Sequence, residues 1–334
     1  MAEKDMYFAD DAARRKYKAR LIIGRVFTYA FLTVFALFML TPFIFMVVSS
    51  FMDAKSFSAF VERADFSELG LFDSNGNWAG NWSIDNYAKI FSGKGSTSLG
   101  TPYESTPFIF YYLNTIIASV GSTTVTVVTA VLAAFAFARL EFKGKNVLFA
   151  LLLATMMIPG EMMVITNYAT TKQLKWEDTF SALIFVHGVS VFYIYYLRQN
   201  FQQIPNELYL AAKVDGVGDF GYLIKVMVPI AMPTITTIII LSLMGSWNSY
   251  IWPNLVANGN WLDKSPIASA LGIETNYDMR LVSNGLMSLF NTQAQGEDAI
   301  KIAGSMVVTA PLFVFFLIFR KYIMRGVSRS GIKG

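Results

Sequence analysis

Cysteine is absent from the 334-residue chain, and histidine occurs once, at His187. Without cysteine, neither a disulfide nor a thiolate metal site or nucleophile is available. One histidine also removes most metal-binding and acid–base arrangements from consideration. We expect His187 to be a packed polar residue inside a membrane span, with a proton or substrate role as the alternative. The sequence therefore predicts no catalytic residue and no metal site.

Charge is also scarce, with 15% charged and 54% hydrophobic residues, which is too apolar for a soluble domain of this size and indicates a polytopic membrane protein. The chain has no Gly-x4-Gly-Lys-Ser/Thr motif, and the stretch 93–96 lacks the spacing of a phosphate loop. It therefore cannot hydrolyse ATP unaided. The pI is about 9.0, but the basic residues are distributed as membrane topology predicts, so we expect no nucleic-acid partner.

Apolar stretches predict an all-α fold with six transmembrane helices. The first has 26 residues without a charge and is interpreted as a retained span rather than a signal peptide. The second is dense in Ser, Thr and Ala, which favour close helix contacts with hydrogen bonds across them. The predicted spans are 26–51, 108–138, one from 147 that is broken at 159–160, 179–197, 228–251 and 302–319.

The polar segments between the spans define the expected domains. These are a cytoplasmic segment 1–25, the first span 26–51, an external insertion 52–107 and a permease core 108–334. Within the core we expect cytoplasmic helices at 205–228, an external segment at 252–301 and a cytoplasmic tail at 320–334. The aromatic residues of the insertion predict a small folded core of its own, with stacking on a sugar or a partner as the alternative.

The distribution of positive charge predicts the orientation. Eighteen of the 27 Lys and Arg residues fall in the N-terminal segment, the 139–145 loop, the 198–228 segment and the tail. The other nine are spread over much longer segments on the opposite side. Because cytoplasmic loops carry the excess of Lys and Arg, both termini and the 205–228 segment are expected to be cytoplasmic.

The residues from 204 to 233 form the one long polar interruption in the second half of the chain. A helix is expected to begin after Pro205, with Glu207 in its first turn, and to end at Gly216. A second helical pattern from 219 to 226 leads into the next span. Its apolar residues are expected on one face: Phe220, Leu223, Ile224 and Met227. Together these helices predict a compact knob, residues 206–227.

The sequence Ala211-Ala212, then Gly216, then Val226-x-Val228-Pro229 resembles the EAA signature of bacterial ABC importer permeases at every spacing. Leu210 stands where the family has glutamate, and Glu207, one turn earlier, is a candidate substitute. The resemblance implies that a separate cytoplasmic ATPase holds the knob; the alternative is an interfacial loop that binds nothing. The expected coupling residues are Glu207, Leu210, Ala211, Ala212, Asp215 and Gly216.

Further stretches resemble the carbohydrate-importer branch, the relatives of the maltose permeases. They are Asn114-Thr115, 133–145, 156–168, 246–254 and 331–334. This resemblance implies a sugar substrate, with glycerol phosphate and polyamine permeases as alternatives. It also implies a second permease subunit, two ATPase subunits that bind ATP and Mg, and an extracellular or periplasmic solute-binding protein that contacts the 252–301 segment. The chain itself needs no cofactor and is expected in a bacterial or archaeal cytoplasmic membrane.

Polar residues inside spans are costly and usually face a cavity or the bundle interior. Aromatic faces pack on sugar CH surfaces, and amides exchange hydrogen bonds with hydroxyls. The candidate substrate path consists of Asn114, Asn167, Trp247, Asn248 and Tyr250. Interhelical packing and interfacial anchoring are the alternative roles.

Other classes of membrane protein are weighed against this interpretation. An ion-coupled secondary transporter favours buried carboxylates within its spans, and these spans contain almost none. A scaffold without transport predicts no cavity between spans. An intramembrane enzyme lacks a plausible acid–base pair here.

Overall fold

The computed structural model describes residues 11–52, 56–57, 61, 82–92, 94–96, 102–104, 108–257, 279–291 and 298–328. Contacts divide the chain into two compact units, residues 1–86 and 87–334. Much of the predicted insertion 52–107, most of the external segment 252–301 and the end of the cytoplasmic tail lie outside the described residues.

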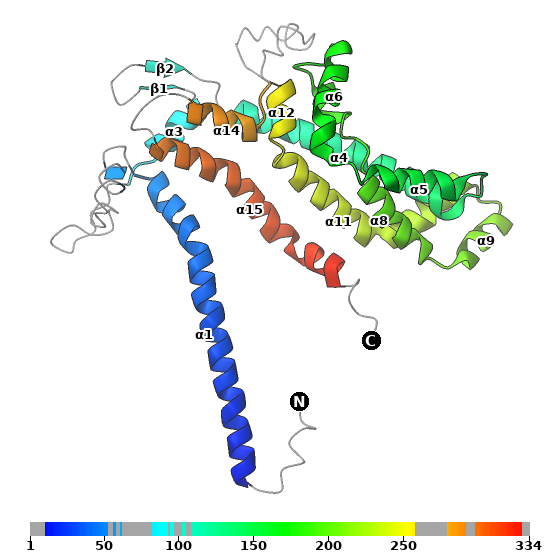
Figure 1. Cartoon of the computed structure of the whole chain (residues 1–334), viewed down its shortest axis with the longest axis horizontal. Helices are drawn as coiled ribbons and strands as arrows, with labels where there is room; N and C mark the ends of the chain where they lie inside the picture. Colours follow the sequence, from blue (N-terminus) through cyan, green and yellow to red (C-terminus); the bar gives the residue numbers. More distant parts are fainter. Residues whose placement is uncertain are drawn as a thin grey trace. The chain divides into compact units, whose positions relative to one another are not determined.

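The first unit contains one long helix, α1 (Asp11–Ser50), which includes all but the last residue of the predicted first span (Figure 1). Its side chains are exposed from residue 15 to residue 45. The C-terminal end of α1 is closed by Asn86, whose side-chain amide donates to the carbonyl oxygens of Ser50 (3.0 Å) and Met52 (2.8 Å). These bonds satisfy acceptors that a helix end leaves unpaired.

One small antiparallel ladder interrupts the helical pattern among the described residues. It follows α3 (Asp85–Ser92) and pairs β1 (Lys94–Ser96) with β2 (Pro102–Glu104), with Gly95 opposite Tyr103. These two short segments lie within the predicted insertion and pair through their backbones, and they leave the predicted all-α class unchanged. The remainder of the described chain is helical.

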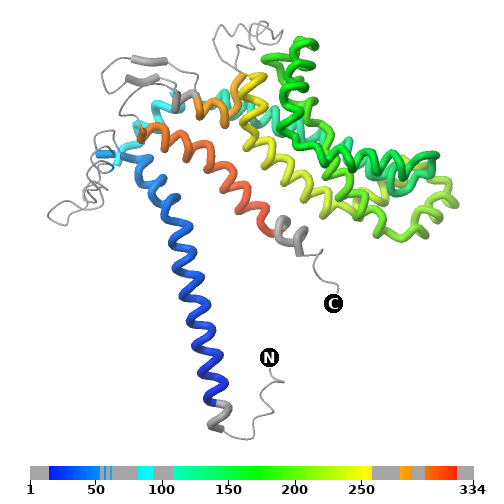
Figure 2. The backbone as a smooth tube through the Cα atoms, viewed as in Figure 1, coloured from blue at the N-terminus to red at the C-terminus, as the bar shows by residue number. Residues whose placement is uncertain are grey.

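The helices of the second unit are grouped around α4 (Figures 1 and 2). α4 packs against α7, α8, α11 and α14, and α11 also packs against α15. In chain order the helices are α4 (Phe108–Arg139), α5 (Lys145–Thr155), α6 (Gly160–Gln173), α7 (Phe180–Ile184), α8 (Val191–Gln202), α9 (Asn206–Val214), α10 (Asp219–Tyr222), the π-helix η3 (Leu223–Met227), α11 (Val228–Trp247), α12 (Ile251–Val256), α14 (Val282–Asn291) and α15 (Asp298–Ser328).

Small residues bring α4 and its neighbours close together, as the composition of the second span predicts. A Cβ atom on Gly121 would lie 2.6 Å from Ile184 Cδ1, and one on Gly188 would lie 2.5 Å from Val125 Cγ1. The Thr129 hydroxyl donates to the carbonyl oxygen of Gly188 (2.8 Å) across the same contact. Close approach with hydrogen bonds between helices is typical of membrane helix packing.

Four described helices are long and apolar enough to cross a membrane, and they correspond to the predicted first, second, fifth and sixth spans, although the helices end at residue 50 rather than 51 and at 247 rather than 251. They are Arg15–Ser50, Phe108–Arg139, Asp219–Trp247 and Asp298–Lys321. The axes of α5 and α6 differ by 96° at the predicted break, and the pair counts as a fifth candidate span if the two helices form one span. The predicted fourth span, 179–197, is divided between α7 and α8. A total of six spans stays a prediction.

Candidate coupling site and transport path

α9 ends at a glycine, as predicted. Gly216 adopts a left-handed conformation with φ 74°. The N–H of Val217 donates to the carbonyl oxygen of Ala212 (2.8 Å), and the N–H of Gly216 donates to that of Lys213 (3.1 Å). These two bonds are the closing pattern of a helix that ends at a left-handed glycine, and they set the bend of the knob.

Three polar side chains connect the two arms of the knob across this bend. Asp219 accepts a hydrogen bond from the Tyr209 hydroxyl and forms an ion pair with the Lys213 ammonium group, each at 2.6 Å. The hydrogen bond to Asp219 raises the pKa of Tyr209 and also that of Lys213. The Tyr209 ring meets the edge of Tyr222 with 5.1 Å between ring centroids. The angle between α9 and α10 is therefore held by side chains as well as by the backbone.

The inner side of the knob is part of a hydrophobic cluster formed with α4, α8 and α11. Tyr222, Leu223 and Met227 are fully buried, whereas Phe220 is 67% exposed and Ile224 is 49% exposed. The prediction that the apolar residues of this helix share one face is therefore wrong. Residues 223–227 of this stretch form a π-helical turn rather than a continuous α-helix.

The outer side of the knob presents most of the predicted coupling residues. Ala212 is buried at 9% exposure, whereas Glu207, Leu210, Ala211, Asp215 and Gly216 are exposed. Leu210 is 56% exposed and Val214 is 88% exposed, so the outer side of α9 is partly apolar. An exposed apolar surface of this kind is typical of a contact with a partner protein.

Two arginines join α4 to α8 at the base of the knob. The Arg139 guanidinium donates to the carbonyl oxygens of Phe201 (3.0 Å) and Ile204, close to the end of α8. Arg198 on α8 donates in return to the carbonyl oxygen of Phe137 near the end of α4 (3.1 Å). Each arginine thus adds a hydrogen bond to carbonyl groups at the end of the other helix, where the backbone offers few donors. Sequence reasoning missed this pair, although each arginine is the first charge after a predicted span.

Two of the three predicted path asparagines, Asn114 and Asn167, lie on different helices. Asn114 on α4 is buried, and its Nδ2 donates to the carbonyl oxygen of Arg280 (3.1 Å). Asn167 on α6 is half-buried, and its backbone carbonyl accepts a hydrogen bond from Thr171 (2.8 Å). The Asn114 amide thus positions the backbone just before α14.

Trp247 belongs to a group of side chains that contacts α15 beside a proline. Pro311 has no N–H, so the carbonyl group of Val307, four residues earlier, lacks its helical donor. The Tyr112 hydroxyl from α4 donates to that oxygen. The Trp247 indole N–H donates to the next carbonyl oxygen, that of Val308 (3.4 Å), and the two rings lie 5.9 Å apart. Trp247 therefore has an interhelical packing role, whether or not it also contacts substrate.

Asn248 and Tyr250 follow Trp247 and are exposed. The Asn248 Nδ2 donates to the carbonyl oxygen of Met244 (2.9 Å), which leaves its side-chain oxygen available. The predicted role of these residues in the substrate path stays a prediction. His187 packs edge-on against Trp252 with 5.2 Å between ring centroids.

A protein-family model described as "Binding-protein-dependent transport system inner membrane component" matches residues 126–329, more than half of the chain. The chain belongs to this family. The matched range contains the whole knob and α15. The expected EAA-type permease is thereby confirmed.

The sequence of this permease aligns with those of known transport proteins over most of its length. It is 28% identical over 252 residues to the arabinooligosaccharides transport system permease protein AraQ of Bacillus subtilis, covering 75% of this chain and 79% of the relative. It is also 28% identical over 310 residues to the polygalacturonan/rhamnogalacturonan transport system permease protein YtcP of the same organism, covering 92% and 96%. A chain in the crystal structure of a bacterial ABC transporter that is involved in the import of the acidic polysaccharide alginate shares the fold, with a TM-score of 0.65 and 20% sequence identity. The match covers 94% of this chain and 99% of that chain.

Family membership confirms several sequence-based predictions. The permease is a transport subunit rather than an enzyme, and it is a multi-pass protein of the cytoplasmic membrane. Members of such systems work with an ATPase and a solute-binding protein.

Proposed function

We propose that this permease passes an oligosaccharide, or a fragment of a polysaccharide, that a solute-binding protein delivers. Support comes from the relatives named for arabinooligosaccharides and polygalacturonan/rhamnogalacturonan. In the proposed assembly it pairs with a second permease subunit and two ATPase subunits, which bind the ATP and Mg. Glycerol phosphate, polyamine and ion-coupled transport receive no support from these relatives.

The observation that carries the proposed mechanism is the two-sided knob. Its outer side exposes Leu210 and Val214, and its inner side buries Tyr222 and Met227 among the helices of the second unit. A push from the ATPase on the outer side would therefore reach α4, α8 and α11 through packed side chains. Closure of the ATPase subunits then drives alternating access at the substrate path.

Gly216 offers a direct test of this coupling. A Cβ atom at this position meets nothing within 4 Å, but φ is +74°, so Gly216→Val introduces backbone strain without a steric clash. Gly218→Val is the matched control, because Gly218 also has free space but an extended conformation with φ −68°. In the reconstituted importer we expect Gly216→Val to hydrolyse ATP with little uptake and Gly218→Val to transport normally. Wild-type uptake by Gly216→Val would contradict the mechanism.

The substrate class is tested separately in proteoliposomes that contain the assembled importer and its binding protein. Labelled arabinooligosaccharides, glycerol 3-phosphate and spermidine are supplied in parallel, with ATP inside the vesicles or with an imposed proton or sodium gradient. We expect ATP-dependent uptake of the oligosaccharides alone. Uptake that requires the gradient and not ATP would instead identify a secondary transporter.

A further inference from the structure

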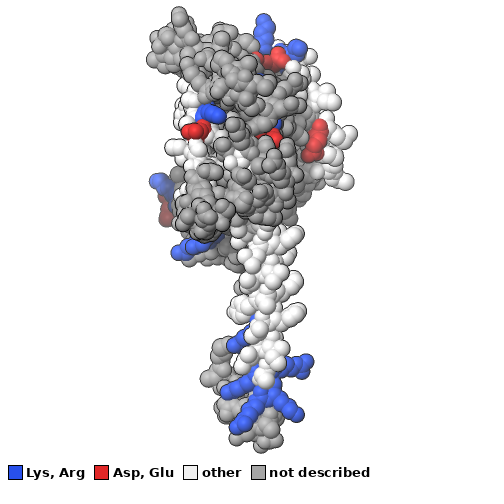
Figure 3. All heavy atoms as spheres, turned by 90° about the vertical axis from the view of Figure 1, so that its left-hand side faces the viewer, with Lys and Arg blue, Asp and Glu red and all other residues white. Residues whose placement is uncertain are grey.

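Basic side chains surround the N-terminal end of α1 (Figure 3). The chain contains no acidic residue between positions 12 and 52. The exposed basic residues here, none of which forms an ion pair within the described residues, are Arg15, Lys16, Lys18, Arg20 and Arg25. Residues 12–25 are therefore a positively charged segment of the chain.

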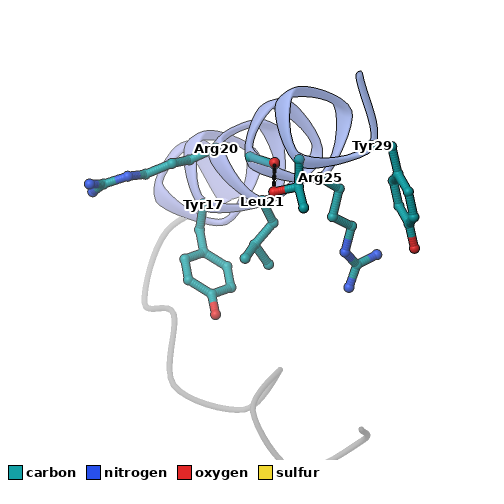
Figure 4. A pocket seen from close by; sticks show the side chains of 7 residues that line it. Tyr17, Arg20, Leu21, Arg25 and Tyr29 are labelled. Carbon is teal, nitrogen blue, oxygen red and sulfur yellow. Dashed lines mark hydrogen bonds between the residues drawn. The ribbon is translucent and has the colours of Figure 1, made fainter. Parts of the chain in front are cut away.

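A groove lies within this basic segment, and Figure 4 shows Arg20, Leu21 and Arg25 among its lining residues. Gly24, which has no side chain, also lines it. Nothing lies within 4 Å of the position that a Gly24 Cβ would occupy. Helical geometry places Thr28 beside Gly24 along the groove and puts Arg20 and Arg25 on opposite sides of it. The floor of the groove is formed by Gly24 and Thr28, which are both small. The Thr28 hydroxyl donates to the Gly24 carbonyl oxygen of its own helix (2.8 Å), so this polar group is already hydrogen-bonded. Leu21 completes the lining between the two arginines.

The position of the groove along α1 corresponds to a membrane surface. The apolar run begins at Val26, directly after Arg25. With a rise of about 1.5 Å per residue, Arg20 lies about 7.5 Å further out along the helix. This distance is close to the thickness of one headgroup layer, about 5–7 Å. Tyr29, one turn inside the boundary, has the amphipathic ring typical of interfacial anchors.

We propose that this groove binds the phosphate headgroup of an anionic phospholipid, with Arg20 and Arg25 donating to its oxygens from two sides. The glycerol backbone lies over Gly24, where no side chain occupies the space. The lipid, rather than a protein, is the occupant because the groove faces the headgroup layer and because planar guanidinium groups match phosphate geometry. The site lies outside the knob and the predicted substrate path, so it is independent of the proposed transport function.

The test measures lipid retention by the full-length permease. The purified protein is exchanged into detergent with equal amounts of phosphatidylglycerol and phosphatidylcholine, and the bound lipids are counted by native mass spectrometry. We expect phosphatidylglycerol to be preferred, and Arg20→Gln and Arg25→Gln each to lower its binding about fivefold. Lys143→Gln and Lys172→Gln, which neutralise exposed lysines before α5 and in the last turn of α6, are the matched controls.

Two further variants retain the charge that orients the helix. Gly24→Leu fills the groove and is expected to reduce phosphatidylglycerol retention with every arginine present. The Arg20→Lys, Arg25→Lys double variant keeps the charge without the planar guanidinium groups and is expected to be intermediate. Equal losses in the lysine controls, or unchanged retention in Gly24→Leu and in the arginine variants, would overturn the proposal. If the arginine variants retained phosphatidylglycerol normally but no longer copurified with the ATPase subunits, the groove would be identified as a protein contact instead.

Discussion

α1 and α4 are both long apolar helices, and both are long enough to cross a membrane. Their surfaces differ. α1 carries mainly Phe, Leu, Val and Met, and its side chains from residue 15 to residue 45 are exposed. α4 carries Ser, Thr, Ala and Gly along its length, and twelve of its side chains are buried against other helices. Apolar character thus predicts that a helix enters the membrane, whereas small and hydroxyl-bearing residues predict where it packs, because lipid is as apolar as Leu.

The largest expected difference in stability between variants of α1 and variants at the α4 contact involves two glycines. Gly188→Val places a Cβ atom 2.5 Å from Val125 Cγ1, a contact with α4, whereas Gly24→Val on α1 meets nothing within 4 Å. We expect Gly188→Val to destabilise the fold by roughly 1–3 kcal/mol, as overpacking usually does. Gly24→Val should change the melting temperature little. Equal melting temperatures for the two variants in detergent would show that the α4 contact is not close.

A comparison of arginines is expected to give the next largest effect. Arg139→Gln removes the donor to the Phe201 and Ile204 carbonyls, whereas Arg15→Gln removes an exposed side chain from α1. The Phe201 carbonyl group keeps its bond from the Ile204 N–H, but the Ile204 carbonyl group loses the arginine donor, and an unsatisfied buried acceptor costs about 1–3 kcal/mol. Thermal unfolding should register the loss in Arg139→Gln alone. Because the bonds lie at the base of the knob, the same variant is expected to lower coupled ATPase activity in the assembled importer.

Tyr112→Phe tests whether the Tyr112 hydroxyl stabilises the carbonyl group that Pro311 leaves without a helical donor on α15. The variant loses the donor to the Val307 carbonyl group and is expected to cost about 1 kcal/mol. Pro311→Ala restores the missing backbone N–H, so the double variant should recover part of that loss. Tyr29→Phe on α1 is the control and is expected to be neutral. Strictly additive effects of Tyr112→Phe and Pro311→Ala on the melting temperature would argue against a shared carbonyl group.

Removing a threonine hydroxyl is expected to give the smallest difference in unfolding free energy between α4 and α1. Thr123 on α4 donates to the Ser242 hydroxyl on α11 (3.2 Å), whereas the Thr28 hydroxyl on α1 donates to the Gly24 carbonyl oxygen of its own helix (2.8 Å). Thr123→Val is expected to cost about 0.6 kcal/mol, the average for such bonds between membrane helices. Thr28→Val should be neutral. Indistinguishable unfolding of the two variants would place Thr123 among the residues that contribute nothing to packing.

Sequence patterns predicted the knob well because its determinants are local. The motif spacing placed Gly216 at the bend, and the structure has its left-handed conformation there. The patterns failed where a local rule met a less common geometry. In the knob, Leu223 and Met227 are fully buried whereas Phe220 and Ile224 are exposed, and residues 223–227 form a π-helical turn.

The candidate path was harder to predict because polar residues in spans have two competing uses. Asn114 and Trp247 were selected as sugar contacts, and both have backbone hydrogen bonds to other helices or loops. A sequence does not reveal which carbonyl groups lack a donor in the folded chain. Pro311 was the one available signal, because a proline within a helix leaves the carbonyl four residues earlier unpaired.

By itself, the sequence determined that this protein is a permease of long apolar helices with a bent knob at 206–227. Hydrophobic runs, charge distribution and motif spacing are properties of neighbouring residues, so they can be read before folding. The tertiary structure alone decided which helices meet and which side chains complete them. Tyr112 reaches a carbonyl group 195 positions away, and Arg139 reaches one 62 positions away. Such bonds depend on how helices pack and on which backbone groups the packing leaves unpaired, and no local pattern encodes either.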